Sequence, residues 1–321
     1  MKKHLKDLNI IDNFLFNELM LQEDKEQAKE FARLVLEPII KKKIGKLEIE
    51  GQKIIQGIDT GKRGIQMDAY IKVYENSAGE EMADVSISSI PIIYDLEPNK
   101  IVGSEEKRAR LYHSIIDANI TKSNSKYDEL YDVYVILLLP YDPFGLSRMM
   151  YTIRQQCIEE PAMPYNDGAT TIFLNAYGTK DIPSKKLSDM LKYLVDSSED
   201  NAVNPELIKL HNMTKVIKDN SMIEVKYMQS WEEKEYYKQQ GIKIGLEKGI
   251  SQGISQGISQ GKLISLAETI LEELITYGDV DEELKNTIKT EEDISILKSW
   301  CKLSMTVCSI DEFKTKMNKP S

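Results

Sequence analysis

The feature that most restricts the fold of this chain is a short apolar run, VYVILLL, at residues 133–139. A strand with one face in water alternates apolar and polar residues, whereas an almost unbroken apolar run is typical of a sheet strand covered on both faces. The run is far too short to cross a membrane as a helix. We therefore expect a strand that lies inside a sheet with cover on both sides.

The segments before this run are predicted to form a strand and a helix that pack beside it. Residues 65–74 alternate between an apolar face and a polar face, which predicts a strand, and Asp68 lies in the middle of its polar face. Residues 104–119 predict a helix with a buried stripe that includes Ile115. A strand, a helix and a buried strand in this order predict a mixed α/β sheet with a crossover connection.

Helical patterns come before and after this sheet. Residues 8–37 carry apolar side chains at helical spacing, and we expect Pro38 to end that helix. From Asp181 onward the chain is again helical, with a break expected near Asn220. These patterns divide the chain into an α/β domain and an all-helical C-terminal region.

An internal repeat interrupts the helical region. Its glycines recur every four residues, at Gly241, Gly245, Gly249, Gly253, Gly257 and Gly261. Each glycine in a helix loses roughly 1 kcal/mol relative to alanine, and a four-residue period overshoots the helical turn. Two interpretations stay open: a helix that packs closely against another chain through its glycines, and a flexible linker.

The predicted domain boundaries follow from these patterns. We expect an α/β domain at 1–180, a helical extension at 181–240, the glycine-repeat linker or helix at 241–261, and a small helical module at 262–321.

Composition narrows the class of protein. Hydrophobic residues make up 41% of the 321 residues and charged residues 29%, which is typical of a soluble globular protein. No signal segment is visible, and the three cysteines form no C-x-x-C motif, so we expect a cytoplasmic protein with no membrane partner. The net charge of −10 argues against non-specific coating of nucleic acid but leaves local phosphate contacts open.

Isolated carboxylates on two strand-like segments are the candidate chemical groups. Asp68 lies in one segment, and Asp95, Glu97 and Asn99 share one face of the next, where Pro98 marks a strand end. Mg²⁺ prefers oxygen ligands and commonly takes one or two protein carboxylates. Spacing alone does not separate a metal site from a plain solvent-facing strand, which is the more common case.

Several segments in order along residues 5–240 carry a family resemblance. They are Asp12-Asn13-Phe14-Leu15-Phe16, Gly64-Ile65-Gln66-Met67-Asp68-Ala69-Tyr70, Tyr94-Asp95-Leu96-Glu97-Pro98-Asn99, Lys107-Arg108-Ala109-Arg110-Leu111-Tyr112-His113-Ser114, Asp142-Pro143-Phe144-Gly145 and Asn166-Asp167-Gly168-Ala169-Thr170. With these segments the chain resembles the Rpn-type recombination-promoting nucleases and putative transposases of the PD-(D/E)xK superfamily. Residues 75–91 are longer than the family's hairpin at this point, so we expect a surface elaboration there.

The resemblance implies a restriction-endonuclease-like core that cleaves DNA with Mg²⁺. By motif position, Asp68 matches the first metal acid and Glu97 the second. Asn99 stands where the superfamily has lysine and this family often has glutamine; an asparagine can orient water but carries no charge. Lys100 is adjacent and should face the other way in a regular strand. Asp12 resembles an upstream accessory acid, and helix capping is the alternative role.

The resemblance also suggests a partner. Arg108 and Tyr112, one helical turn apart, would form an aromatic-lined contact to DNA phosphate, and packing with Arg108 paired to an acid is the equal alternative. Two other classes of function stay open. One is a catalytically weak nuclease-fold module that binds DNA or protein, and the other is a scaffold that assembles into a homo-oligomer through its C-terminal helices.

Overall fold

The computed structural model describes residues 3–51, 53–55, 65–74, 91–100, 102–121 and 126–317. The surface elaboration expected at 75–91 lies outside these ranges except for Pro91. The chain divides into two compact units, Met1–Ser230 and Trp231–Ser321, and the division falls inside one helix. Each unit is described by itself.

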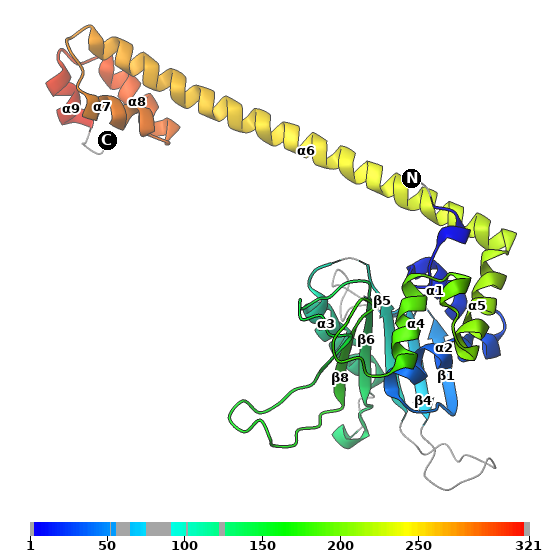
Figure 1. Cartoon of the computed structure of the whole chain (residues 1–321). Helices are drawn as coiled ribbons and strands as arrows, with labels where there is room; N and C mark the ends of the chain where they lie inside the picture. The colour runs from blue at the N-terminus through cyan, green and yellow to red at the C-terminus, as the bar shows by residue number, and fades with distance from the viewer. Residues whose placement is uncertain are drawn as a thin grey trace. The chain divides into compact units, whose positions relative to one another are not determined.

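A mixed six-stranded sheet forms the centre of the first unit (Figure 1). Its strands are β1 (Lys46–Gly51), β4 (Ala69–Tyr74), β5 (Ile92–Pro98), β6 (Val133–Leu139), β8 (Ala169–Asn175) and β7 (Met150–Ile153), in that spatial order. β5, β6 and β8 are parallel, whereas β1, β4 and β7 join by antiparallel pairing. Two short strands, β2 (Ile54–Ile55) and β3 (Ile65–Gln66), form a separate antiparallel pair.

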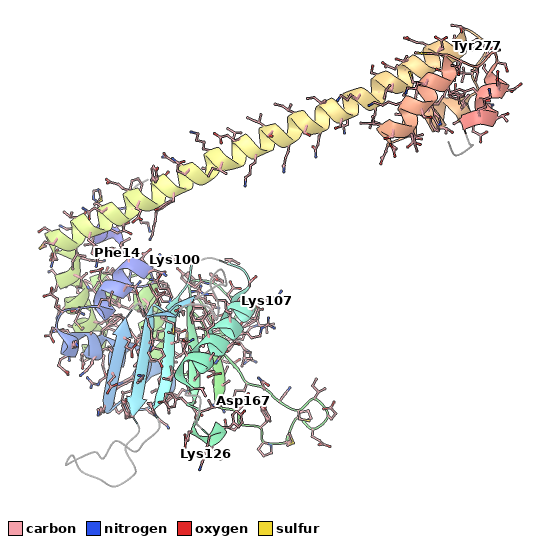
Figure 2. The ribbon with its side chains drawn as sticks, turned by 180° about the vertical axis from the view of Figure 1, so that it is seen from behind. Phe14, Lys100, Lys107, Lys126, Asp167 and Tyr277 are labelled. Atoms are coloured by element: carbon pink, nitrogen blue, oxygen red, sulfur yellow. The ribbon has the colours of Figure 1, made fainter. Side chains whose placement is uncertain are left out.

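Helices cover both faces of this sheet, as the apolar run at 133–139 predicts. On one face lie α1 (Asn13–Met20), α2 (Lys25–Ile40), α4 (Lys185–Val195) and α5 (Pro205–Lys218). On the other lies the crossover helix α3 (Glu105–Ile120), which is seen in front of the sheet in Figure 2. Leu138 of β6 packs in the first core and Leu137 in the second, so both faces of β6 are buried. Short 3₁₀ turns occur at Leu5–Asp7, Tyr127–Glu129 and Glu199–Asn201.

The prediction of one helix over 8–37 is wrong in two respects. Asp24 begins a second helix, because its carboxylate accepts hydrogen bonds from the backbone amides of Glu26 and Gln27. Pro38 lies inside α2, which continues to Ile40. A proline removes one hydrogen-bond donor, and a position in the last turn leaves little helix to disrupt.

Residues 65–74 are likewise not one strand. β3 pairs with β2 and β4 pairs with β1 and β5, so the chain bends between them, and Asp68 lies in this bend rather than mid-strand. The backbone amide of Met67 donates to the carbonyl of Lys53 at 3.0 Å, which ties the bend to the β2 segment. The bend aims the Asp68 amide at a side chain instead of a strand partner.

The second unit is helical. The long helix α6 (Ser221–Ile275) is followed by α7 (Glu282–Thr290), α8 (Ile294–Ser304) and α9 (Ile310–Met317). The C-terminal end of α6 packs with the other three around Leu274, Ile288, Leu297 and Phe313. Helix α5 ends at Lys218 and α6 begins at Ser221, which confirms the break predicted near Asn220. Among the described residues, no helix is long and apolar enough to span a membrane.

The glycine repeat is helical. All six repeat glycines lie within α6, and a Cβ atom added to any of them would contact nothing within 4 Å. The isoleucines behind them are exposed too, with 54% of Ile250 and 58% of Ile254 open to solvent. The sequence left open a packed helix and a flexible linker. The repeat has the secondary structure of a helix.

Replacing Gly249 and Gly257 with alanine should stabilise α6, because alanine loses less backbone entropy in a helix and the added Cβ has open space. We expect about 1 kcal/mol per site, read as a higher melting temperature and a larger 222 nm signal in circular dichroism. Gly278→Ala is the matched control. Gly278 has a φ of 142°, a backbone conformation that residues with a side chain rarely adopt, so alanine there should lower the stability of the folded chain. Loss of helicity in the α6 variants would contradict an open helical repeat.

Candidate functional site

The antiparallel register of β4 and β5 brings Asp68 and Glu97 together. Ala69 pairs with Leu96 and Tyr70 with Asp95, so Asp68 lies opposite Glu97. The backbone amide of Asp68 donates to Oε1 of Glu97 at 3.0 Å. Both side chains are buried, with 7% of Asp68 and 1% of Glu97 exposed. The two predicted metal acids are therefore neighbours.

Two asparagines of α1 hold the Asp68 carboxylate. Nδ2 of Asn13 donates to Oδ2, and Nδ2 of Asn17 donates to Oδ1, both at 3.1 Å. Residues four apart lie on one face of a helix, which lets both amides reach one carboxylate. Sequence reasoning missed this pair, although two asparagines at this spacing in the first predicted helix were a visible signal.

Arg108 of α3 pairs with Glu97. Its Nη2 donates to Oε2 of Glu97 and, at 3.3 Å, to the hydroxyl of Tyr112. The Tyr112 hydroxyl donates in turn to the carbonyl of Gln66 at 3.2 Å. The acid-paired alternative for Arg108 is thus what the structure contains, and 32% of the arginine side chain remains open to solvent. Contact of Arg108 and Tyr112 with DNA stays a prediction.

Asp95 is the least compensated group of the site. It is completely buried on β5, and neither carboxylate oxygen has a hydrogen-bond partner among the described residues. Burial raises the pKa of Asp95 most and the neighbouring Glu97 raises it further, although no hydrogen bond of normal geometry joins the two carboxyl groups. An ionised carboxylate without partners is costly to bury, so this position favours either a proton or a cation.

The pKa values of all three carboxyl groups are raised. Burial is the largest cause for each, and it raises the pKa of Glu97 to about 7 with a further contribution from Asp68. Burial together with Glu97 and Asp68 raises the pKa of Asp95 well above its usual range. Arg108 opposes these shifts but supplies a single positive charge. The cluster therefore contains three carboxyl groups and one cationic side chain, so ionisation of all three would leave a net negative charge.

These residues fit a divalent cation in charge and in ligand chemistry. Mg²⁺ takes oxygen ligands and keeps most of its water, so one or two carboxylates suffice. Within the ranges that the structure describes, no three Asp, Glu, His or Cys side chains converge on one ion position. Beyond the effect of burial, Asp68 raises the pKa values of Glu97 and Asp95, and Glu97 raises the pKa of Asp95. The three acids are nevertheless not arranged as a closed set of ligands.

Asn99 and Lys100 face different partners. Nδ2 of Asn99 donates to the hydroxyl of Tyr141 at 3.2 Å, and that hydroxyl donates to Glu105 at 2.7 Å. Lys100 forms an ion pair with Asp12. Tyr141 was not predicted. It follows β6, which runs parallel to β5, so both strands end at the same edge of the sheet.

Asp12 does not fill the role of helix cap. It occupies the N-cap position of α1, but its side chain makes no capping hydrogen bond. Instead Oδ2 accepts from the backbone amide of Asn9 at 2.9 Å, and Oδ1 accepts from Lys100. α1 therefore contributes Asn13 and Asn17 to the carboxylate cluster, and Asp12 binds Lys100 beside it.

Comparisons of this chain with protein-family models, curated proteins and solved structures find no match.

We expect the site to make stability depend on pH. The pKa of Glu97 is about 7 in the folded chain against an ordinary 4.5, so the native state keeps a proton that the unfolded chain releases between these values. The contribution is fully present below pH 4.5 and is lost as the pH rises through 7. The loss is on the order of 3 kcal/mol at most.

Glu97→Gln should flatten this dependence, since glutamine does not titrate. Thermal unfolding of the full chain at pH 5 and pH 8 measures it, with Glu106→Gln, an exposed carboxylate of α3, as the control. Equal pH dependence in the wild type and in Glu97→Gln would count against a buried, strained carboxylate at this position.

Proposed function

We propose that this chain is a Mg²⁺-dependent DNA endonuclease that hydrolyses phosphodiester bonds, with Asp68 and Glu97 holding the cation. The observation that carries the proposal is the group of three buried carboxyl groups with one arginine, Arg108, paired to Glu97. A bound divalent cation would supply the missing positive charge and polarise the phosphodiester. The resemblance adds a restriction-endonuclease-like core and a link to recombination or mobile elements, and the cysteine usage adds a cytoplasmic location. All three are parts of this proposal.

The residues of the chain have distinct tasks in this proposal. Asn13 and Asn17 fix the orientation of the Asp68 carboxylate through their amides. Arg108 neutralises part of the Glu97 charge in the free protein and, being partly exposed, can turn to a phosphate oxygen when a cation takes its place. Asn99, held by Tyr141, offers its polar side chain at the end of β5. Asp95, buried on the same face of β5 as Glu97, would add negative charge once a bound cation lowers its pKa.

A second function, a catalytically weak module that binds DNA or protein, has its own supporting observation. Both oxygens of Asp68 and both oxygens of Glu97 already accept hydrogen bonds from protein donors. Asn99 cannot supply the positive charge of the superfamily lysine, because an amide is neutral. A cation would therefore have to compete with the donors Asn13, Asn17 and Arg108.

Supercoiled plasmid tests the two functions. We expect purified wild-type protein to nick the plasmid with Mg²⁺ and not with EDTA, and Asp68→Ala to lower the rate at least a hundredfold, because the first metal acid is lost. Asp189→Ala is the matched control, since this partly buried acid of α4 pairs with Lys185 and lies outside the carboxylate cluster. Nicking that survives Asp68→Ala and Glu97→Ala would remove the nuclease assignment. DNA binding without nicking would favour the binding module.

Assembly through the C-terminal helices is the remaining proposal. The exposed isoleucines and glycines of α6 give a helix face on which a second copy could pack. We expect light scattering to report a larger mass than one 36.7 kDa chain, and a chain that ends at Gln240 to lose that excess. An unchanged number of chains per particle after truncation would show that the repeat assembles nothing.

A further inference from the structure

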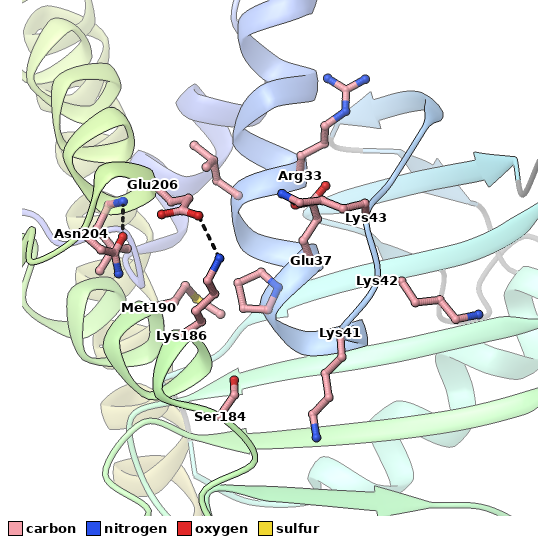
Figure 3. Close-up of a pocket in the computed structure, with 13 residues that line it drawn as sticks. Arg33, Glu37, Lys41, Lys42, Lys43, Ser184, Lys186, Met190, Asn204 and Glu206 are labelled. Atoms are coloured by element: carbon pink, nitrogen blue, oxygen red, sulfur yellow. Dashed lines mark hydrogen bonds and ion pairs between the residues drawn. The ribbon is translucent and has the colours of Figure 1, made fainter. Parts of the chain in front are cut away.

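A cavity of about 410 Å³ lies where α2, α4 and α5 meet, on the face of the sheet opposite α3 (Figure 3). The C-terminal half of α2, the segment 41–43 and the first turns of α4 and α5 form its walls. No residue of the candidate carboxylate site lines it. Its volume is within the range of ligand sites for small molecules.

Positive charge gathers around this cavity in a chain whose total charge is −10. Its cationic lining residues are Arg33, Lys41, Lys42, Lys43 and Lys186, and its anionic ones are Glu37 and Glu206. Both acids are already paired. Lys43 lies 2.6 Å from Glu37, and Lys186 lies 2.9 Å from Glu206. The pairs neutralise the acids, so the excess charge of the lining is positive.

Two helix N-termini add to this field. Ser184 caps α4 and Asn204 caps α5, each accepting a hydrogen bond from a backbone amide of its first turn. Both capping residues line the cavity. The N-terminus of a helix carries partial positive charge, so the two helices reinforce the lysines. The field at the cavity therefore favours an anion.

The rest of the lining is apolar. Leu34 and Pro38 of α2, Met190 of α4 and Leu207 of α5 contribute carbon surface between the charged groups. A bare inorganic anion would leave this surface in water, and an uncharged apolar molecule would leave the excess positive charge of the lining unneutralised. A ligand with both an apolar body and an acidic group satisfies both parts of the lining.

We propose that this cavity binds a small organic anion, with its phosphate, sulfonate or carboxylate beside Lys186 and Lys43 and its apolar body against Pro38, Met190 and Leu207. Glu206 lowers the affinity of the cavity for an anion. Its carboxylate pairs with Lys186 and also lies near enough to Lys43 to interact with that charge. Removing Glu206 should therefore strengthen anion binding, and removing Lys186 should weaken it.

The test uses the full-length protein and the fluorescent anion 8-anilinonaphthalene-1-sulfonate. We expect saturable binding that is about fivefold weaker in Lys186→Gln and about fivefold tighter in Glu206→Gln, the size of one exposed charge interaction. Lys185→Gln is the matched control. It removes a neighbouring lysine of α4 that pairs with Asp189 and does not line the cavity. Melting curves by circular dichroism confirm that each variant is folded.

Two further measurements separate the contribution of the ligand's charge from that of its apolar body. The uncharged analogue N-phenyl-1-naphthylamine should bind more weakly and should not distinguish the variants. Adenosine monophosphate and octanoate are the competitors; displacement by either supports the proposal and tells a phosphorylated ring ligand from an aliphatic acid. Identical binding in wild type, Lys186→Gln and Glu206→Gln overturns the proposal, as does bound dye that neither competitor displaces at millimolar concentration.

Discussion

The burial of β5 on both faces is the constraint from which the candidate site follows. Helices lie on either side of this strand, so the polar residues of one face are withdrawn from water together with the apolar ones. Asp95 and Glu97 must then be protonated, paired or bound to a cation. Arg108, Asn13, Asn17 and the Asp68 amide are the donors that the fold supplies, and none of them reaches Asp95.

Much of the fold could be predicted from patterns that depend on local sequence. The unbroken apolar run at 133–139, the alternation before it and the amphipathic helix between them are all direct results of which faces are buried. The points where strands and helices are interrupted or end were harder to predict. Whether 65–74 is one strand depends on β2 and β3 pairing with each other, and the fate of Pro38 depends on where α2 happens to end. These are tertiary facts with weak local signals.

The residues of the candidate site likewise divide into those that local sequence patterns predict and those that only the tertiary structure brings together. Alternation along 95–99 correctly placed Asp95 and Glu97 on one face, and register brought Asp68 beside them. Asn13, Asn17 and Tyr141 come from other elements, so no spacing within the two strands could point to them. The raised pKa of Glu97 depends on how completely α3 covers the strand, which sequence gives only in outline.

The hydrogen bond from the Asp68 amide to Glu97 makes the two acids unequal as targets of mutation. The main chain is the donor, so any residue at position 68 other than proline keeps this bond. A change at position 97 that removes the acceptor also removes the anchor of the bend before β4. Lost function in a Glu97 variant would thus mix altered chemistry with an altered backbone, whereas a change at Asp68 isolates the carboxylate.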